Sequence, residues 1–130
     1  MQQAVGKITK FTDLQAWKSA HRLRLYVYKL TKKFPADEQF ALTSQIRRAS
    51  VSVASCLAEG FSRQTAADKA HFYTMSLGSL TEVQDQFLLA KDLDYINKVE
   101  FDELAQESIV THKLINGLIR SLKAGKGVTR

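Results

Sequence analysis

The sequence predicts an all-α protein, and three observations favour that class. Leu, Ala, Lys, Gln and Glu are abundant, and these residues favour helices. A single proline, Pro35, occurs in 130 residues, and the six glycines leave most of the chain uninterrupted. Apolar residues recur at the three- and four-residue spacing of amphipathic helices. The length suits a single domain, 1–130, with a core large enough to need no disulfide or metal.

The first half of the chain predicts two helices. The first covers about residues 13–33 and stops before Pro35, which also restricts the residue that precedes it. The second covers about residues 37–60. Asp37 is expected to cap its N-terminus, and Gly60 is expected to end it.

The second half predicts two more helices. Thr65 and Asp68 resemble a capping box, with Asp in place of Glu, that opens a helix over residues 65–93. The fourth helix spans about residues 102–122. Connections this short favour antiparallel neighbours, so we expect an antiparallel up-down four-helix bundle. Flexible tails are expected at both ends, over residues 1–10 and 124–130.

The first helix carries two apolar stripes, whereas a simple bundle requires one. At about 100° per residue, the two stripes lie more than a third of a turn apart, so the second must pack against a further surface. The sequence therefore predicts a homo-oligomer. The first stripe consists of Ala16, Ala20, Leu23, Val27, Leu30 and Phe34. The second stripe, the predicted oligomer interface, consists of Leu14, Trp17, His21, Leu25 and Tyr28.

Positive charge is concentrated in the first half of the chain. The formal net charge is +6, with ten Lys and Arg against three Asp and Glu in residues 1–50 and nine against ten in residues 51–130. A basic stripe on the first helix falls within roughly 100° of arc. It could follow the phosphates of a nucleic acid, or it could be a solvated face. The basic stripe consists of Lys18, Arg22, Lys29, Lys32 and Lys33.

Two adjacent arginines on the second helix have two interpretations. Arg47 and Arg48 could extend the phosphate-binding surface. Alternatively, Arg48 could form a structural ion pair with Glu82, because the two residues lie at similar heights in a hairpin of the second and third helices. Gly78 would then permit the close approach of the two helices.

The sequence favours neither catalysis nor a cofactor. His21, His71 and His112 fall on three different helices, without the close spacing that makes a helical metal site specific. Cys56 is the only cysteine, so it forms no disulfide within the chain, and no residue that would orient it as a nucleophile is apparent. We expect no catalytic residues, no metal and no cofactor. With no signal peptide and no apolar run near the roughly 20 residues of a membrane span, a cytoplasmic protein without membrane association is expected.

Several segments together resemble the 23S rRNA intervening-sequence protein family, also called the four-helix bundle protein family of bacteria. They are residues 11–17, 34–35, 42–49, 58–60 and 77–83. One departure is Cys56, where the family usually has asparagine. The resemblance implies an antiparallel four-helix bundle that assembles into a ring-like homopentamer. It also implies kinship with accessory proteins of diversity-generating retroelements, which bind nucleic acid and a reverse transcriptase.

Two functional hypotheses follow. The first is a non-enzymatic, homo-oligomeric bundle that binds structured RNA or DNA through phosphate contacts from the first helix and from Arg47 and Arg48, with a link to rRNA intervening sequences. The second is a protein-interaction scaffold. Its basic and apolar stripes would serve assembly or dock an acidic protein partner such as a reverse transcriptase.

Overall fold

The computed structural model describes residues 7–124 and contains four long helices. They are α1 (Gln15–Thr31), α2 (Leu42–Ser62), α3 (Ala66–Asp92) and α4 (Lys98–Lys123). Two short 3-10 turns precede α1 and α2, namely η1 (Phe11–Asp13) and η2 (Ala36–Glu38). The described part of the chain contains no strand, so the all-α prediction is confirmed.

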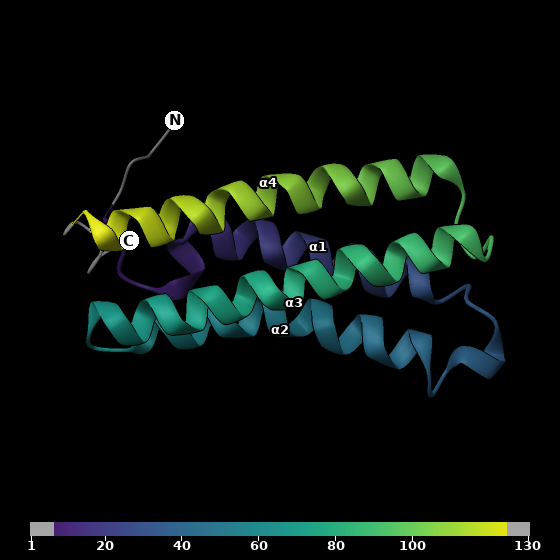
Figure 1. Ribbon diagram of the computed structural model, residues 1–130, viewed down its shortest axis with the longest axis horizontal. Coiled ribbons are helices and arrows are strands. Elements are labelled where there is room, and N and C mark those ends of the chain that lie inside the picture. The colour runs from purple at the N-terminus through teal and green to yellow at the C-terminus, as the bar shows by residue number, and fades with distance from the viewer. Residues whose placement is uncertain (1–6, 125–130) are drawn as a thin grey trace.

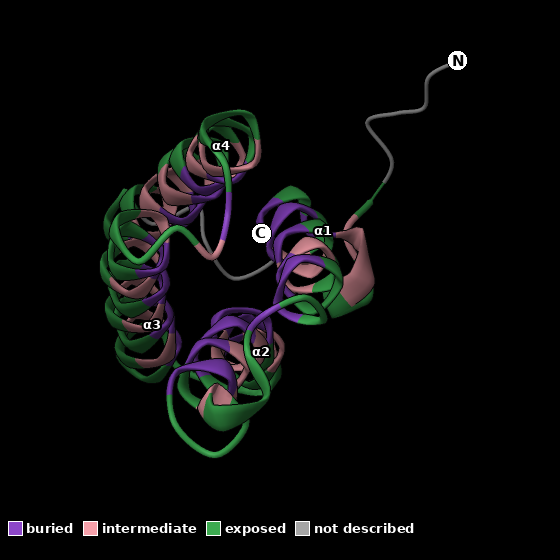
Figure 2. Cartoon of the chain, turned by 90° about the vertical axis from the view of Figure 1, so that its right-hand side faces the viewer, coloured by how far each residue is buried: buried purple, intermediate pink, exposed green. Residues whose placement is uncertain are grey.

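Each helix packs beside the next one in the sequence, and α4 also packs against α1 (Figure 1). Viewed end on, the buried residues of the four helices face one another around a common interior (Figure 2). The largest side chains that are fully buried there include Tyr73, Phe87, Leu23, Ile46 and Leu57. Within residues 7–124, no helix is long and apolar enough to cross a membrane.

The first helix begins two residues later than predicted, because Asp13 belongs to a separate turn. Its carboxylate accepts the backbone N–H groups of Thr9 and Lys10, each at 3.0 Å. These backbone hydrogen bonds hold the pKa of the Asp13 carboxyl below its usual value. Residues 9 and 10 of the segment that we expected to be a tail are therefore held in a local turn, and Ile8 before them packs against the core. Residues 1–6 and 125–130 of the predicted tails lie outside the described part of the chain.

The prediction that Asp37 caps α2 was wrong. Asp37 lies in η2, and α2 begins only at Leu42. Glu38 serves this end of the helix instead. Its carboxylate accepts the Leu42 backbone N–H at 3.2 Å and the Tyr95 hydroxyl at 2.7 Å. One side chain thus joins the start of α2 to the loop between α3 and α4.

The prediction that Gly60 ends α2 was also wrong, because the helix continues to Ser62. Gly60 is buried against α3, where a Cβ atom would lie 2.7 Å from Cε1 of Tyr73. Its lack of a side chain is therefore used for close packing of two helices rather than for termination. Nearby, the Ser76 hydroxyl donates to the Val53 carbonyl at 2.6 Å, which requires the same close approach.

The starts of α3 and α4 use side-chain caps. The Thr65 side chain accepts the Asp68 N–H at 3.1 Å, so the predicted Thr65 cap is confirmed. Helix α4 begins four residues before the predicted start, because Asn97 and Glu100 form a reciprocal capping box. The Asn97 side chain accepts the Glu100 N–H at 2.8 Å, and the Glu100 carboxylate accepts the Asn97 N–H at 3.0 Å.

Substitution of Gly60 tests the close packing of α2 and α3. Because a Cβ at this position would overlap the buried Tyr73 ring, Gly60→Ala should lower the free energy of unfolding by about 1–3 kcal/mol. Urea denaturation measures the difference. Gly78→Ala is the matched control, since its Cβ would meet no atom within 4 Å and should be neutral or stabilise α3 by about 0.5–1 kcal/mol. Equal effects of the two changes would contradict the packing role of Gly60.

Candidate nucleic-acid interface

Three lysines of the predicted basic stripe remain available on the surface. Lys18, Lys29 and Lys32 are exposed, and none of them forms an ion pair with a described residue. They lie on the outward side of α1, whose opposite side carries the buried residues Leu23 and Val27. Their ammonium groups can thus meet an anion from solution, and Lys29 in addition helps to lower the pKa of the Glu100 carboxyl.

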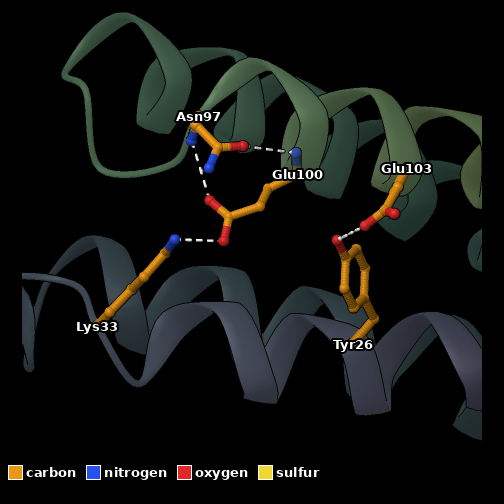
Figure 3. A network of polar contacts seen from close by, with 5 residues as sticks. All are labelled: Tyr26, Lys33, Asn97, Glu100 and Glu103. Carbon is orange, nitrogen blue, oxygen red and sulfur yellow. Dashed lines mark hydrogen bonds and ion pairs between the residues drawn. The ribbon is translucent and has the colours of Figure 1, made fainter.

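The other two members of the basic stripe are engaged by carboxylates of α4. Lys33 pairs with Glu100, and Arg22 Nε lies 3.7 Å from a carboxylate oxygen of Glu107 (Figure 3 shows the Lys33 pair). The hydrogen bond from Lys33 is the main reason that the pKa of the Glu100 carboxyl lies below its usual value. The sequence predicted all five residues as phosphate ligands, but carboxylates of the same chain partly neutralise the charges of Arg22 and Lys33.

A third carboxylate extends this contact between α1 and α4. Glu103 accepts the Tyr26 hydroxyl at 2.5 Å (Figure 3). Burial and this hydrogen bond raise the pKa of the Tyr26 phenol. Glu107 also accepts the Ser19 hydroxyl at 2.8 Å. Along the edge between α1 and α4, the three glutamates are thus each paired with a hydrogen-bond donor or a cation from the first helical segment. The sequence signal for it was the spacing of the three glutamates, which places them on one face of α4.

Arg47 is held between α1 and α2, which makes it a packing residue. Its guanidinium carbon lies 4.6 Å from the centre of the Tyr28 ring, and its Nε donates to the Thr31 hydroxyl at 2.8 Å. A half-buried guanidinium fixed in this way gains from the aromatic ring and has little freedom to reach a phosphate. The prediction that Arg47 binds nucleic acid is therefore not supported by its position.

Arg48 is exposed, and the predicted direct ion pair with Glu82 is not among the ion pairs of residues 7–124. Its guanidinium instead reaches back one turn and donates to the Ser44 hydroxyl at 3.2 Å. Arg48 and Glu82 nevertheless line the same groove between α2 and α3, as expected for residues at similar heights along the two helices. Gly78 does not mediate this approach, because its Cβ position faces open space.

The predicted oligomer interface divides into a covered part and an open part. Leu14 is only 3% exposed and belongs to the core of the single chain, so it cannot contact a second copy. Trp17 and His21 are half-buried and stack with their ring centres 4.8 Å apart, while Phe11 of η1 packs edge-on against Trp17. The turn η1 thus covers this end of the stripe, which explains the wrong assignment of Leu14.

The open part of the stripe consists of Leu25 and Tyr28, which are 57% and 40% exposed. Sequence periodicity on α1 did not reveal that α3 and α4 also expose large apolar side chains. On α3 these are Met75, Leu88 and Leu89, and Leu93 follows directly after this helix. On α4 they are Val99, Ile109 and Val110. Such residues are candidates for contacts with other molecules.

The remaining candidate chemical groups are not gathered into a site. Cys56 is half-buried, with its Sγ 3.6 Å from the Ser52 hydroxyl oxygen. Among residues 7–124, no three His, Cys, Asp or Glu side chains are grouped so that they could hold a metal ion.

The pair of Lys33 and Glu100 should contribute to stability in a pH-dependent way. Because folding lowers the pKa of Glu100, its contribution is present at neutral pH and is lost as the pH falls through the folded-state pKa. Glu100→Gln should therefore destabilise the protein at about pH 7, by less than about 1 kcal/mol for such a surface pair, and have little effect at about pH 3. Urea denaturation at both pH values tests this. Asp102→Asn, which removes the more exposed pair with Lys98, is the control and should be near neutral. A loss that is equally large at acid pH would contradict the assignment.

Comparison with known proteins identifies the relatives of this chain. The family model of the 23S rRNA-intervening sequence protein matches residues 12–117. A crystallised protein of unknown function from the S23 ribosomal protein family of Bacteroides thetaiotaomicron VPI-5482 has a similar fold. The two share 19% sequence identity with a TM-score of 0.75, over 81% of this chain and 95% of the other. Comparison with curated proteins gives no match. The family match covers most of the chain and nearly all of the bundle, and the chain therefore belongs to the 23S rRNA-intervening sequence protein family.

Proposed function

We propose that this protein is a non-enzymatic, homo-oligomeric bundle that binds structured RNA or DNA through phosphate contacts. The observation that supports this most directly is the set of exposed cations without a carboxylate partner in the described chain. Lys18 and Lys29 lie on α1, Lys32 follows directly after this helix, and Arg48 lies on α2. Arg22 and Lys33 contribute less, because Glu107 and Glu100 offset their charge.

The distribution of charge supports an anionic ligand on the side of α1 and α2. Residues 1–63 contain eleven Lys and Arg against four Asp and Glu, whereas residues 64–130 contain eight against nine. A surface that carries excess positive charge attracts nucleic acids from solution and releases their counterions on binding. Lysines provide this attraction without reading base edges, so the phosphate contacts should be independent of sequence. The name of the family refers to intervening sequences of 23S rRNA, which makes structured RNA the first ligand to test.

Assembly into a homo-oligomer would strengthen such binding. Leu25 and Tyr28 on α1, beside the free lysines, provide exposed apolar area for contact between copies. The family resemblance favours an antiparallel up-down bundle in a ring-like homopentamer. In a ring, each copy presents the same cations, so one RNA molecule could engage several of them and gain affinity through multivalency.

A second candidate function is a scaffold that docks an acidic protein, such as a reverse transcriptase. The exposed apolar residues on α3 and directly after it favour this alternative, since Met75, Leu88, Leu89 and Leu93 are each 43–48% exposed. Partner binding that persists without nucleic acid would favour the scaffold. Loss of binding at high salt together with a steep salt slope would favour nucleic acid.

Neutralising the free lysines tests the proposed function. A variant with Lys18→Gln, Lys29→Gln and Lys32→Gln should bind unrelated RNA and DNA sequences more weakly by similar factors. Each lost phosphate contact should also remove roughly 0.7–0.9 from the slope of log affinity against log salt concentration. Fluorescence anisotropy titrations at several salt concentrations measure both quantities.

The control for this experiment carries the same change of charge on α4, through Lys113→Gln, Arg120→Gln and Lys123→Gln. These three residues are exposed and form no ion pair in the described chain. The control should retain most of the affinity and the slope. If both triple variants lose affinity equally, binding depends on net charge alone and the α1 surface is a solvated face.

The oligomer has its own test. Replacing Leu25 and Tyr28 together by serine should give smaller particles in light scattering, with helical content by circular dichroism largely retained. Val99→Ser, which changes a more exposed apolar residue on α4, is the control and should leave the particle size unchanged. A wild-type protein that is monomeric at micromolar concentration would exclude the homo-oligomer.

A further inference from the structure

A polar groove between α2 and α3 joins two of the segments that carry the family resemblance. Its volume is about 200 Å³. This is smaller than the roughly 300–1,000 Å³ of pockets for drug-sized ligands, so it suits a single ring system or side chain. Helix α2 contributes Gln45, Arg48, Ala49 and Ser52, and α3 contributes Ser79, Glu82 and Gln86.

One residue that lines the groove has a buried hydrogen-bond acceptor without a donor. The Gln86 Oε1 atom is buried and makes no hydrogen bond, although the amide nitrogen of the same side chain donates to Gln45 Oε1 at 3.4 Å. The hydroxyls of Ser52 and Ser79 satisfy each other at 2.8 Å. The Gln86 oxygen is covered by surrounding atoms, so a ligand in the groove would meet the charged side chains of the rim instead.

The rim of the groove carries two opposite charges that form no ion pair with each other. Arg48 donates to the Ser44 hydroxyl, which leaves most of its five N–H groups free. Glu82 is exposed, and its carboxylate has no ion-pair partner among residues 7–124. The groove therefore offers N–H donors from α2 and acceptors from α3.

This pattern constrains the charge of the ligand. A carboxylate or phosphate inside the groove would suit Arg48 but would be repelled by Glu82. A guanidinium or ammonium group would suit Glu82 but would be repelled by Arg48. A neutral ligand that carries acceptors along one edge and at least two N–H donors along another satisfies both sides.

We propose that this groove binds an unpaired guanine base of RNA. The guanine O6 and N7 atoms would accept from Arg48, which is the most common specific contact to guanine. Its N1–H and N2–H groups would donate to the two carboxylate oxygens of Glu82. Single-stranded loops and bulges expose these edges, whereas a duplex hides the N1–H edge. The inference rests on the proposed function, because the α1 lysines would hold the phosphates on either side of the base.

Base analogues test the inference. Short uridine-rich RNA strands with a single central guanosine, inosine, 7-deazaguanosine or adenosine would be titrated in fluorescence anisotropy. Inosine lacks the N2 amino group, and 7-deazaguanosine lacks the N7 acceptor. We expect the guanosine strand to bind about 5- to 100-fold more tightly than the adenosine strand, with both analogues in between.

Two variants assign the contacts to residues. Glu82→Gln should abolish the preference for guanosine over inosine. Arg48→Lys keeps the positive charge, so the salt slope should be retained, but it removes the planar fork and should abolish the preference for guanosine over 7-deazaguanosine. Glu59→Gln, on the same side of α2 but outside the groove, should change neither preference. Circular dichroism and thermal melting would show that each variant is folded.

The outcomes separate this inference from the proposed function. If all four strands bind equally, and the lysine variant still weakens binding, the groove is not a guanine site while the phosphate surface stands. If no strand binds, the proposed function fails, and guanosine monophosphate is then titrated against adenosine monophosphate. Selective NMR shifts of the Gln45 and Gln86 side-chain amides with the guanine nucleotide would uphold the groove on its own, and their absence would overturn it.

Discussion

The close packing of α2 against α3 is the constraint on which the rest of the molecule depends. Gly60 leaves no side chain between the helix backbone and the Tyr73 ring, and the Ser76 hydroxyl reaches the Val53 carbonyl. A helix pair drawn together in this way brings Ser52 and Ser79 into hydrogen-bond contact. The same approach forms the groove whose rim carries Arg48 and Glu82. Packing that is set by small residues thus determines where the polar groups of the surface lie.

The opposite edge of the bundle is joined by polar side chains rather than by close backbones. Glu100, Glu103 and Glu107 of α4 meet Lys33, Tyr26, Ser19 and Arg22 of α1. These contacts decide which cations of α1 can act on other molecules. The residues facing α4 are engaged, whereas Lys18, Lys29 and Lys32 remain available. The functional surface is therefore narrower than the basic stripe in the sequence, and it is displaced toward α2.

The sequence was sufficient for the fold class and for features that depend on local chemistry. Helical periodicity gave four helices, and the Thr65 cap was correct because a cap depends on residues three positions apart. Gly60 was misassigned because a glycine near the end of a helix can either terminate it or admit a neighbour, and only the position of Tyr73 distinguishes the two. Leu14 was assigned to an interface because periodicity on one helix cannot show that η1 folds back over that face.

The candidate site was harder to predict, because its properties depend on contacts between helices. Arg48 and Glu82 were correctly expected at similar heights, but helical spacing could not show that Arg48 would turn back to Ser44. That Glu100 and Glu107 neutralise cations of the basic stripe could likewise be seen only from the relative rotation of α1 and α4. Charge counts along the chain identified the basic half, and only the packing of side chains identified the free cations within it.

Lysine footprinting is the most direct test of the claim that the free cations of α1 contact nucleic acid. The wild-type protein would be acetylated with and without a structured RNA, and the modification of each lysine would be measured by mass spectrometry. RNA should protect Lys18, Lys29 and Lys32 from acetylation, while Lys98 and Lys113 on α4 should be acetylated to the same extent with and without RNA. Protection of the α4 lysines instead, or acetylation of every lysine to the same extent with and without RNA, would contradict the claim that the free cations of α1 contact nucleic acid.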